Sequence, residues 1–210
     1  MAISARRRKA KDSKKNAILR VARSLFLEKG FTDVTVESIA RGVDISKGAV
    51  YLHFNSKDEI YVHVLAREID VFCKEVDAIP LSTMSVNDAL KQFSRMYVDF
   101  FVSKPEIFRI FIGFMLYLDK KPRHHESLYE LVGKTNKAVN VLSIILAKGV
   151  SEGVFSATID KEATRNAIWG MLNGAILLYL FVVKEEQSKK LIKRTVDNGL
   201  IAVLDGIKKC

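Results

Sequence analysis

The sequence predicts an all-α protein with about nine helices. Apolar residues recur at helical spacing along most of the chain, and no segment alternates apolar and polar residues as strands do. Only 3 prolines and 11 glycines interrupt the 210 residues, of which 49% are hydrophobic. A chain of this length can bury a sizeable core in one or two domains. We expect two, at residues 1–57 and residues 58–210.

The first helix is expected over residues 14–29. Its apolar residues are spaced by three and four: Ile18, Ala22, Leu25 and Phe26. Gly30 follows as a helix C-cap. Residues 1–11 hold most of the basic run RRRKAKDSKK, and we expect them to form a disordered basic tail.

Two short helices follow, at VESIARG (residues 36–42) and KGAVYLHF (residues 47–54). Thr35 precedes the first of them and Ser46 precedes the second, as N-caps do. The segment between them leaves room for only a tight turn, and Asp44 is a residue type that tolerates a left-handed backbone. Apolar residues of both helices would share a core with the first helix: Ile39, Ala40, Val50 and Phe54.

A long helix begins at the sequence SKDE, residues 56–59. This is a capping box, in which Ser56 accepts from the amide of Glu59 and Glu59 reaches back. Helical spacing then continues until Pro80, so the helix is about 30 Å long at ~1.5 Å per residue and suits a connector. Further helices are expected at residues 86–102, 105–118, 124–152, 161–184 and 188–207.

Positive charge is concentrated in the first quarter of the chain. The net charge is +10, and residues 1–57 hold thirteen basic against five acidic side chains. A local basic surface attracts polyanions through counterion release. Two short helices joined by a tight turn match the helix-turn-helix, whose second helix enters the major groove of DNA. Lys47 and Tyr51 lie one turn apart on this second helix, and Gly48 between them allows close approach.

The same residues resemble the TetR-like (tetracycline-repressor-like) bacterial transcriptional regulators. The resemblance runs from ILRVARSLFLEKGFTDVTVESIA through SKGAVYLHFNSKDEIYVHV, about fifty residues. Its specific parts are the spacing LF…GF…T, the pattern S-x-G-x-x-Y-x-H-F and the x-K-x-x-[LI] that follows. Where the family often has Ala-Gly in the turn, this chain has Val43-Asp44. The family implies a three-helix DNA-binding domain, a connector helix, and a helical domain for effector binding and dimerisation.

The resemblance assigns two kinds of DNA contact. Phosphates are expected at Thr35, Tyr51, His53 and Lys57, and base edges at Lys47, Gly48, Ala49 and Leu52. The chemistry agrees, because a hydroxyl or imidazole can donate to phosphate without reading sequence, whereas a lysine can donate to guanine N7 and O6. Glu37 is near enough to accept a hydrogen bond from cytosine.

The remaining helices predict a largely apolar pocket. Residues 106–118 are apolar nearly all round, and Arg109 among them would need a partner such as Asp99 or an anionic ligand group. The pocket candidates are Tyr97, Phe101, Phe108, Arg109, Met115, Trp169 and Asn173. Each of them is also compatible with ordinary core packing. By resemblance, a small effector changes the separation of two reading heads. The composition of the pocket indicates that this effector is apolar and acyl-chain-like.

One head covers few base pairs, so we expect a homodimer on a palindromic operator of double-stranded DNA. The last two helices would form a four-helix interface, since Gly170 and Gly174 let helices approach closely. The expected interface residues are Gly170, Gly174, Ile176, Leu177, Leu180, Val196, Ile201 and Leu204. Packing within one chain would use part of the same surface.

The sequence therefore predicts a ligand-responsive transcriptional repressor, with activation left open. No cofactor or metal site is indicated, because Cys73 and Cys210 lack metal-ligand spacing; their scarcity also fits the cytoplasm. The apolar run at residues 167–183 is slightly short for a membrane span. An enzyme is not expected, because His124 and His125 lie in a polar loop without a phosphate-binding glycine motif. The alternative is an apolar-ligand carrier that does not bind DNA.

Overall fold

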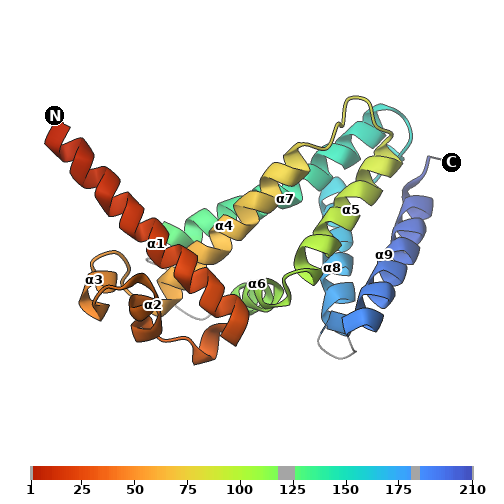
Figure 1. The fold of residues 1–210 in the computed structure, drawn as a ribbon. Helices are drawn as coiled ribbons and strands as arrows, with labels where there is room; N and C mark the ends of the chain where they lie inside the picture. The colour runs from red at the N-terminus through yellow and green to blue at the C-terminus, as the bar shows by residue number, and fades with distance from the viewer. Residues whose placement is uncertain (1, 118–125, 181–184, 210) are drawn as a thin grey trace. The chain divides into compact units, whose positions relative to one another are not determined.

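The computed structural model describes the backbone of residues 2–117, 126–180 and 185–209 (Figure 1). Within these ranges the chain forms nine helices, and its one β pairing is an isolated bridge between Phe155 and Lys208. The helices are α1 (Ala2–Asp33), α2 (Val36–Val43), α3 (Lys47–Tyr51), α4 (Lys57–Asp77), α5 (Val86–Val102), α6 (Pro105–Tyr117), α7 (Glu126–Ser151), α8 (Lys161–Leu180) and α9 (Glu185–Ile207). The predicted all-α class is confirmed.

The chain divides into two compact units. Unit 1 consists of Met1–Glu68 and Glu106–Val132, and unit 2 of Ile69–Pro105 and Gly133–Cys210. The helix α4 therefore contributes its N-terminal part to unit 1 and the remainder to unit 2. The functional boundary after residue 57 stays a prediction.

The N-terminal head, which we define as α1 to α3 with the first turns of α4, has the predicted core. Ile18, Ala22, Ile39 and Val50 are each 0% exposed, and Phe54 is 1% exposed. These residues come from three helices and the segment after α3. Since α2 and α3 are too short to be stable alone, this shared core holds them in place.

Local sequence sets the ends of the short helices as expected. Thr35 caps α2, its Oγ1 accepting from the amide of Ser38 at 3.0 Å, and Ser46 caps α3 by accepting from the amide of Ala49 at 3.1 Å. Asp44 has φ 58°, and it is the one non-glycine residue with positive φ in the described chain. The predicted left-handed turn residue is confirmed.

Three helix boundaries differ from expectation. The first helix begins at Ala2, so the expectation that residues 1–11 are disordered is wrong. Alanine, arginine and lysine are strong helix formers, and extending an existing helix needs no new nucleation. The positive φ of Gly30 (75°) breaks this helix where the C-cap was expected. In addition, α3 already ends at Tyr51 and α4 ends at Asp77.

Unit 2 is built on aromatic packing between the C-terminal part of α4 and α5. Phe72 contacts the rings of Phe93, Tyr97 and Phe100 at centroid distances of 6.2, 5.7 and 5.1 Å. The helices α8 and α9 pack against each other and both pack against α5. None of the described helices combines the length and the apolar composition needed to cross a membrane.

Candidate nucleic-acid interface

The helix α3 presents most of its side chains to solvent. Only Val50 of this helix is buried, whereas Tyr51 is 45% exposed and the following Leu52 is 78% exposed. The arrangement leaves an amphipathic edge of the head available to a partner.

Gly48 is not demanded by the fold. A Cβ added there would meet only the Ser46 Oγ, at 3.8 Å, which is an ordinary contact. The backbone of α3 is therefore bare at this position for a reason other than internal packing. Ala49 beside it is half-buried and also small, so a groove wall could approach the α3 backbone closely.

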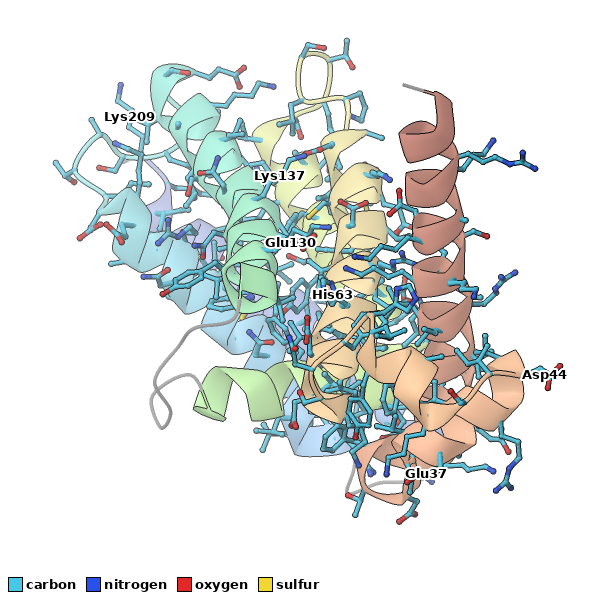
Figure 2. The ribbon with its side chains drawn as sticks, turned by 90° about the vertical axis from the view of Figure 1, so that its left-hand side faces the viewer. Glu37, Asp44, His63, Glu130, Lys137 and Lys209 are labelled. Carbon is cyan, nitrogen blue, oxygen red and sulfur yellow. The ribbon has the colours of Figure 1, made fainter. Side chains whose placement is uncertain are left out.

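Glu37 on α2 and Lys47 on α3 form an ion pair across the turn (Figure 2). The hydrogen bond from Lys47 lowers the pKa of Glu37, and the same bond raises the pKa of Lys47. Both side chains are about half exposed, at 51% and 49%. The two residues expected at base edges thus bind each other in the free protein, so contact with DNA must open or reorient this pair.

Lys57 is turned toward the protein. Its Nζ donates to the carbonyl oxygens of Phe31 at 2.8 Å and Val34 at 2.9 Å, and it lies 4.1 Å from the centroid of the Phe31 ring. The Phe31 oxygen belongs to the last residues of α1, after the break at Gly30, and the Val34 oxygen belongs to the connection between α1 and α2. Lys57 therefore joins the start of α4 to that connection, and its contact with phosphate stays a prediction.

Thr35 and His53 differ in the solvent exposure and the hydrogen bonds of their side chains. The exposed Thr35 hydroxyl accepts from Ser38, which leaves its own proton available to a phosphate. His53 is half-buried, and its Nδ1 has no hydrogen-bond partner in the described structure.

Three lysines that the sequence did not single out act on His53. Burial, and then the charges of Lys11, Lys14 and Lys15, lower the pKa of the His53 imidazole. The signal in the sequence is their helical spacing, which continues the apolar face of α1. Lys14 and Lys15 lie inside the predicted first helix, whereas Lys11 is hidden as long as residues 1–11 are expected to be disordered.

Three of the predicted pocket residues in unit 2, Tyr97, Trp169 and Asn173, form a part-buried chain of hydrogen bonds. Trp169 Nε1 donates to the Tyr97 hydroxyl at 3.0 Å, and that hydroxyl donates to Asn173 Oδ1 at 2.7 Å. Burial raises the pKa of the Tyr97 phenol, so it stays a neutral donor. Phe101 packs edge-on against Tyr97 at 4.9 Å. These four residues are brought together, and they fill the space around one another.

An open groove of about 570 Å³ lies beside this chain, between α7 and α8. Trp169 lines it, together with the amides Asn136, Asn140 and Asn166 and the cations Lys137 and Arg165. The groove is more polar than the expected pocket.

The predicted pocket residues on α6 belong to unit 1. Phe108 is 0% exposed, but the Arg109 side chain is 58% exposed and lies 3.5 Å from Glu106 on its own helix. The expectation of a buried Arg109 is wrong, since α6 turns one face to solvent. Asp99, expected as its partner, instead pairs with Lys193 at 2.9 Å. The side chain of Met115 lies outside the described residues.

The expected dimer residues separate into two groups. Ile176, Val196 and Leu204 are 0%, 2% and 6% exposed, so they belong to the packing of α8 on α9 within the chain and cannot lie at a surface. Leu177 and Ile201 are 49% and 54% exposed. Gly170 and Gly174 face open space, with no atom near an added Cβ, and Leu180 is half-buried. Neighbouring Leu178, which was not expected at the interface, is 62% exposed.

No group of three or more His, Cys, Asp or Glu side chains that could hold a metal ion occurs in the described part of the chain.

Comparison with known proteins places these features in context. Residues 18–64 match the family model described as bacterial regulatory proteins, tetR family. The uncharacterized HTH-type transcriptional regulator YwcC of Bacillus subtilis is 26% identical over 163 residues, which cover 73% of this chain and 70% of that protein. The HTH-type transcriptional repressor NicS of Pseudomonas putida is 26% identical over 144 residues, which cover 69% and 66%.

Solved structures share the fold. The transcriptional regulator FadR from Bacillus subtilis, in complex with stearoyl-CoA, superposes with a TM-score of 0.67 at 16% identity, covering 91% of this chain and 98% of that one. At this identity the likeness concerns the fold alone.

Proposed function

We propose that this chain, which is a TetR-like transcriptional regulator, represses transcription by binding a palindromic operator as a homodimer and leaves it when a small effector binds. The observation that carries the proposal is the head itself. Its two short helices are held on the α1 core by Ile39 and Val50, while the side chains beside them on α3 face outward. A short helix displayed in this way fits the major groove.

The exposed residues of α3 divide between two roles in this proposal. Lys47 and Leu52 read base edges, Lys47 by donating to guanine and Leu52 by contacting a thymine methyl. Tyr51 and Thr35 donate to phosphates, which positions the head without reading sequence. Glu37 releases Lys47 for this purpose, or accepts from cytosine beside it.

A homodimer supplies the second head. Two heads about 34–36 Å apart can occupy successive major grooves on one side of the duplex. The exposed Leu177, Leu178 and Ile201 support an interface on α8 and α9, because these two helices pack together and each displays large apolar side chains to water, which is a common mark of an interaction surface.

The effector in this proposal is apolar and acyl-chain-like. The FadR structure that shares this fold contains stearoyl-CoA, and in this chain the aromatic side chains of Tyr97 and Phe101 pack against each other in unit 2. A tenfold to hundredfold preference of the effector for the shape that cannot bind DNA corresponds to about 1.4–2.8 kcal/mol.

The decisive experiment selects duplexes from a random-sequence pool with the wild-type protein and measures affinity by fluorescence anisotropy. Tyr51→Ala should weaken binding roughly uniformly across sequences, whereas Lys47→Gln should also relax the selected sequence. Tyr129→Ala is a matched control, because Tyr129 is 65% exposed on α7. Equal binding by all three variants and the wild type would refute the assigned interface.

A further inference from the structure

One face of α1 changes character along its length. Ile18 and Ala22, both 0% exposed, lie on the face that packs into the head. Going toward the N-terminus, the same face continues at Lys14 and Lys15, one turn before Ile18, and at Lys11, two turns before it. Lys11 and Lys14 are exposed and Lys15 is half-buried. The apolar face therefore becomes a lysine stripe, consisting of Lys11, Lys14 and Lys15, where α1 leaves the core.

The lysine stripe lies beside the C-terminal end of α3. The Nζ of Lys15 is 5.4 Å from the centroid of the Phe54 ring, and Phe54 directly follows His53. The same Nζ is 3.5 Å from Nε2 of His63 on α4 (Figure 2). All these residues belong to unit 1, so the stripe, His53 and α3 are parts of one compact body.

The cations of this stripe have no anionic partner within the described part of the chain. No carboxylate pairs there with Lys11, Lys14 or Lys15. The same stripe faces the His53 imidazole, whose buried Nδ1 lacks a partner. Three ammonium groups and one imidazole that face each other without a counter-charge repel one another, and an external anion would relieve this repulsion.

We propose that Lys11, Lys14, Lys15 and His53 form a second phosphate-binding site for duplex DNA, next to the α3 reading face and separate from it. The proposal rests on the proposed function, because it names a further part of the surface that meets the same duplex. Ammonium and imidazole groups hold phosphate oxygens without discriminating between bases. The site therefore adds affinity and positions the head, and it does not choose the sequence.

Binding at this site is coupled to a proton. In the free protein, burial and the three lysines hold the pKa of His53 below its usual range. A phosphate beside the lysines offsets their charge, so the pKa of His53 rises in the complex and the complex takes up a proton. Affinity for DNA should therefore increase as the pH falls through the histidine range, about pH 8 to 5.

A second histidine faces the same lysine and must be separated from the first. Burial and then Lys15 lower the pKa of His63, while Glu130 and Glu59 act in the opposite direction. The Glu59 carboxylate lies 3.9 Å from the His63 ring. His63 thus has nearby carboxylates that offset the charge of Lys15, so its pKa should respond less to a phosphate.

The test compares two double variants on duplexes selected by the wild type and on scrambled duplexes. The logarithm of the DNA association constant falls as the logarithm of the salt concentration rises. In Lys11→Gln/Lys14→Gln this decrease should be less steep, by about 0.9 in slope for each phosphate that the variant no longer neutralises, counted over both subunits. Its affinity for selected and scrambled duplexes should fall by the same factor. Lys9→Gln/Arg20→Gln is the matched control, because at ~100° per residue these side chains lie on the opposite face of α1. The control should keep the wild-type slope.

The pH dependence supplies the second readout. His53→Gln should make the affinity nearly independent of pH, while His63→Gln should leave the dependence in place. If the dependence persists in His53→Gln and disappears in His63→Gln, His53 is not part of the site.

The outcomes also separate this inference from the proposed function. If Lys11→Gln/Lys14→Gln keeps the wild-type salt slope while Tyr51→Ala weakens binding, the second phosphate-binding site is refuted and the proposed DNA-binding function is retained. If the wild-type protein selects no duplex at any salt concentration, both the proposed function and the second phosphate-binding site are refuted. Circular dichroism and thermal unfolding of each variant should match the wild type, since Lys11 and Lys14 are exposed.

Discussion

Replacing Lys57 by methionine tests whether this residue holds the head together or holds the DNA. The substitution keeps an unbranched apolar stem and removes the ammonium group, which donates to the carbonyls of Phe31 and Val34. If the two hydrogen bonds from Lys57 stabilise the connection between α1 and α2, Lys57→Met should make the head less stable even in the absence of DNA.

The expected loss follows from the two hydrogen bonds. Bonds from a charged donor contribute about 1.5–3 kcal/mol each. Because Lys57 is half-buried, water replaces part of this contribution, and we expect a total loss of about 2 kcal/mol. For a chain of 210 residues, this corresponds to a decrease in Tm of about 4–8 °C.

Thermal unfolding and the salt dependence of DNA binding together decide between the two roles. Lys57→Met should lower Tm, and Lys57→Arg should recover part of the loss because a guanidinium can donate to the same carbonyls. Lys29→Met is the control, since Lys29 is an exposed residue of α1, and its Tm should match that of the wild type.

The opposite pattern would refute this reasoning. An unchanged Tm for Lys57→Met, together with a salt slope lower by about 0.9 for each phosphate involved, would make Lys57 a phosphate ligand. It would also mean that the bonds to Phe31 and Val34 contribute nothing to the stability of the head.

Three further substitutions probe packing and assembly. Gly42→Ala places a Cβ 2.6 Å from the Val21 Cγ1 and should lower the free energy of unfolding by about 1–3 kcal/mol, measured by chemical denaturation. Adding Val21→Ala to this variant should recover part of the lost stability. If it recovers none, the strain lies elsewhere. Tyr97→Phe removes the hydroxyl that accepts from Trp169 and should lower the free energy of unfolding by about 1–3 kcal/mol, measured by urea unfolding. Unchanged stability would show that the hydrogen bonds among Trp169, Tyr97 and Asn173 do not stabilise the fold. Leu178→Glu should convert the proposed dimer to a monomer in light scattering with unchanged helix content, whereas a dimer in this variant would place the interface off the exposed face of α8.

Local sequence determined much of the fold. The helices were predictable because an apolar residue every three or four positions must lie on one face. Their ends followed from short-range hydrogen bonds, such as those of Thr35 and Ser46, which involve atoms three residues away. The turn residue Asp44 and the α1 to α3 core were predictable for the same reasons. The reading surface was predicted from Lys47 and Tyr51, which lie one turn apart, and from the family resemblance; in the structure Val50 is the one buried residue of α3.

Tertiary structure decided which neighbour each face and each charge meets. Periodicity predicts that Ile176 and Val196 lie on an apolar helix face. Only the packing of α8 on α9 shows that this face is buried within one chain and does not meet a second subunit there. Lys57 carries a charge whose partners the sequence cannot name, and the sequence does not show that Arg109 is exposed. The Lys57 partners lie more than twenty positions away, and the solvent around Arg109 depends on how α6 is covered.

The sequence by itself therefore determined the helices, their caps and the character of each face, because these depend on interactions within a few residues. Only the tertiary structure decided that the charges of Lys11, Lys14 and Lys15 act on His53 and that Glu37 pairs with Lys47. Contacts of this kind join residues ten to forty positions apart, and their geometry is set by how whole helices pack around a shared core.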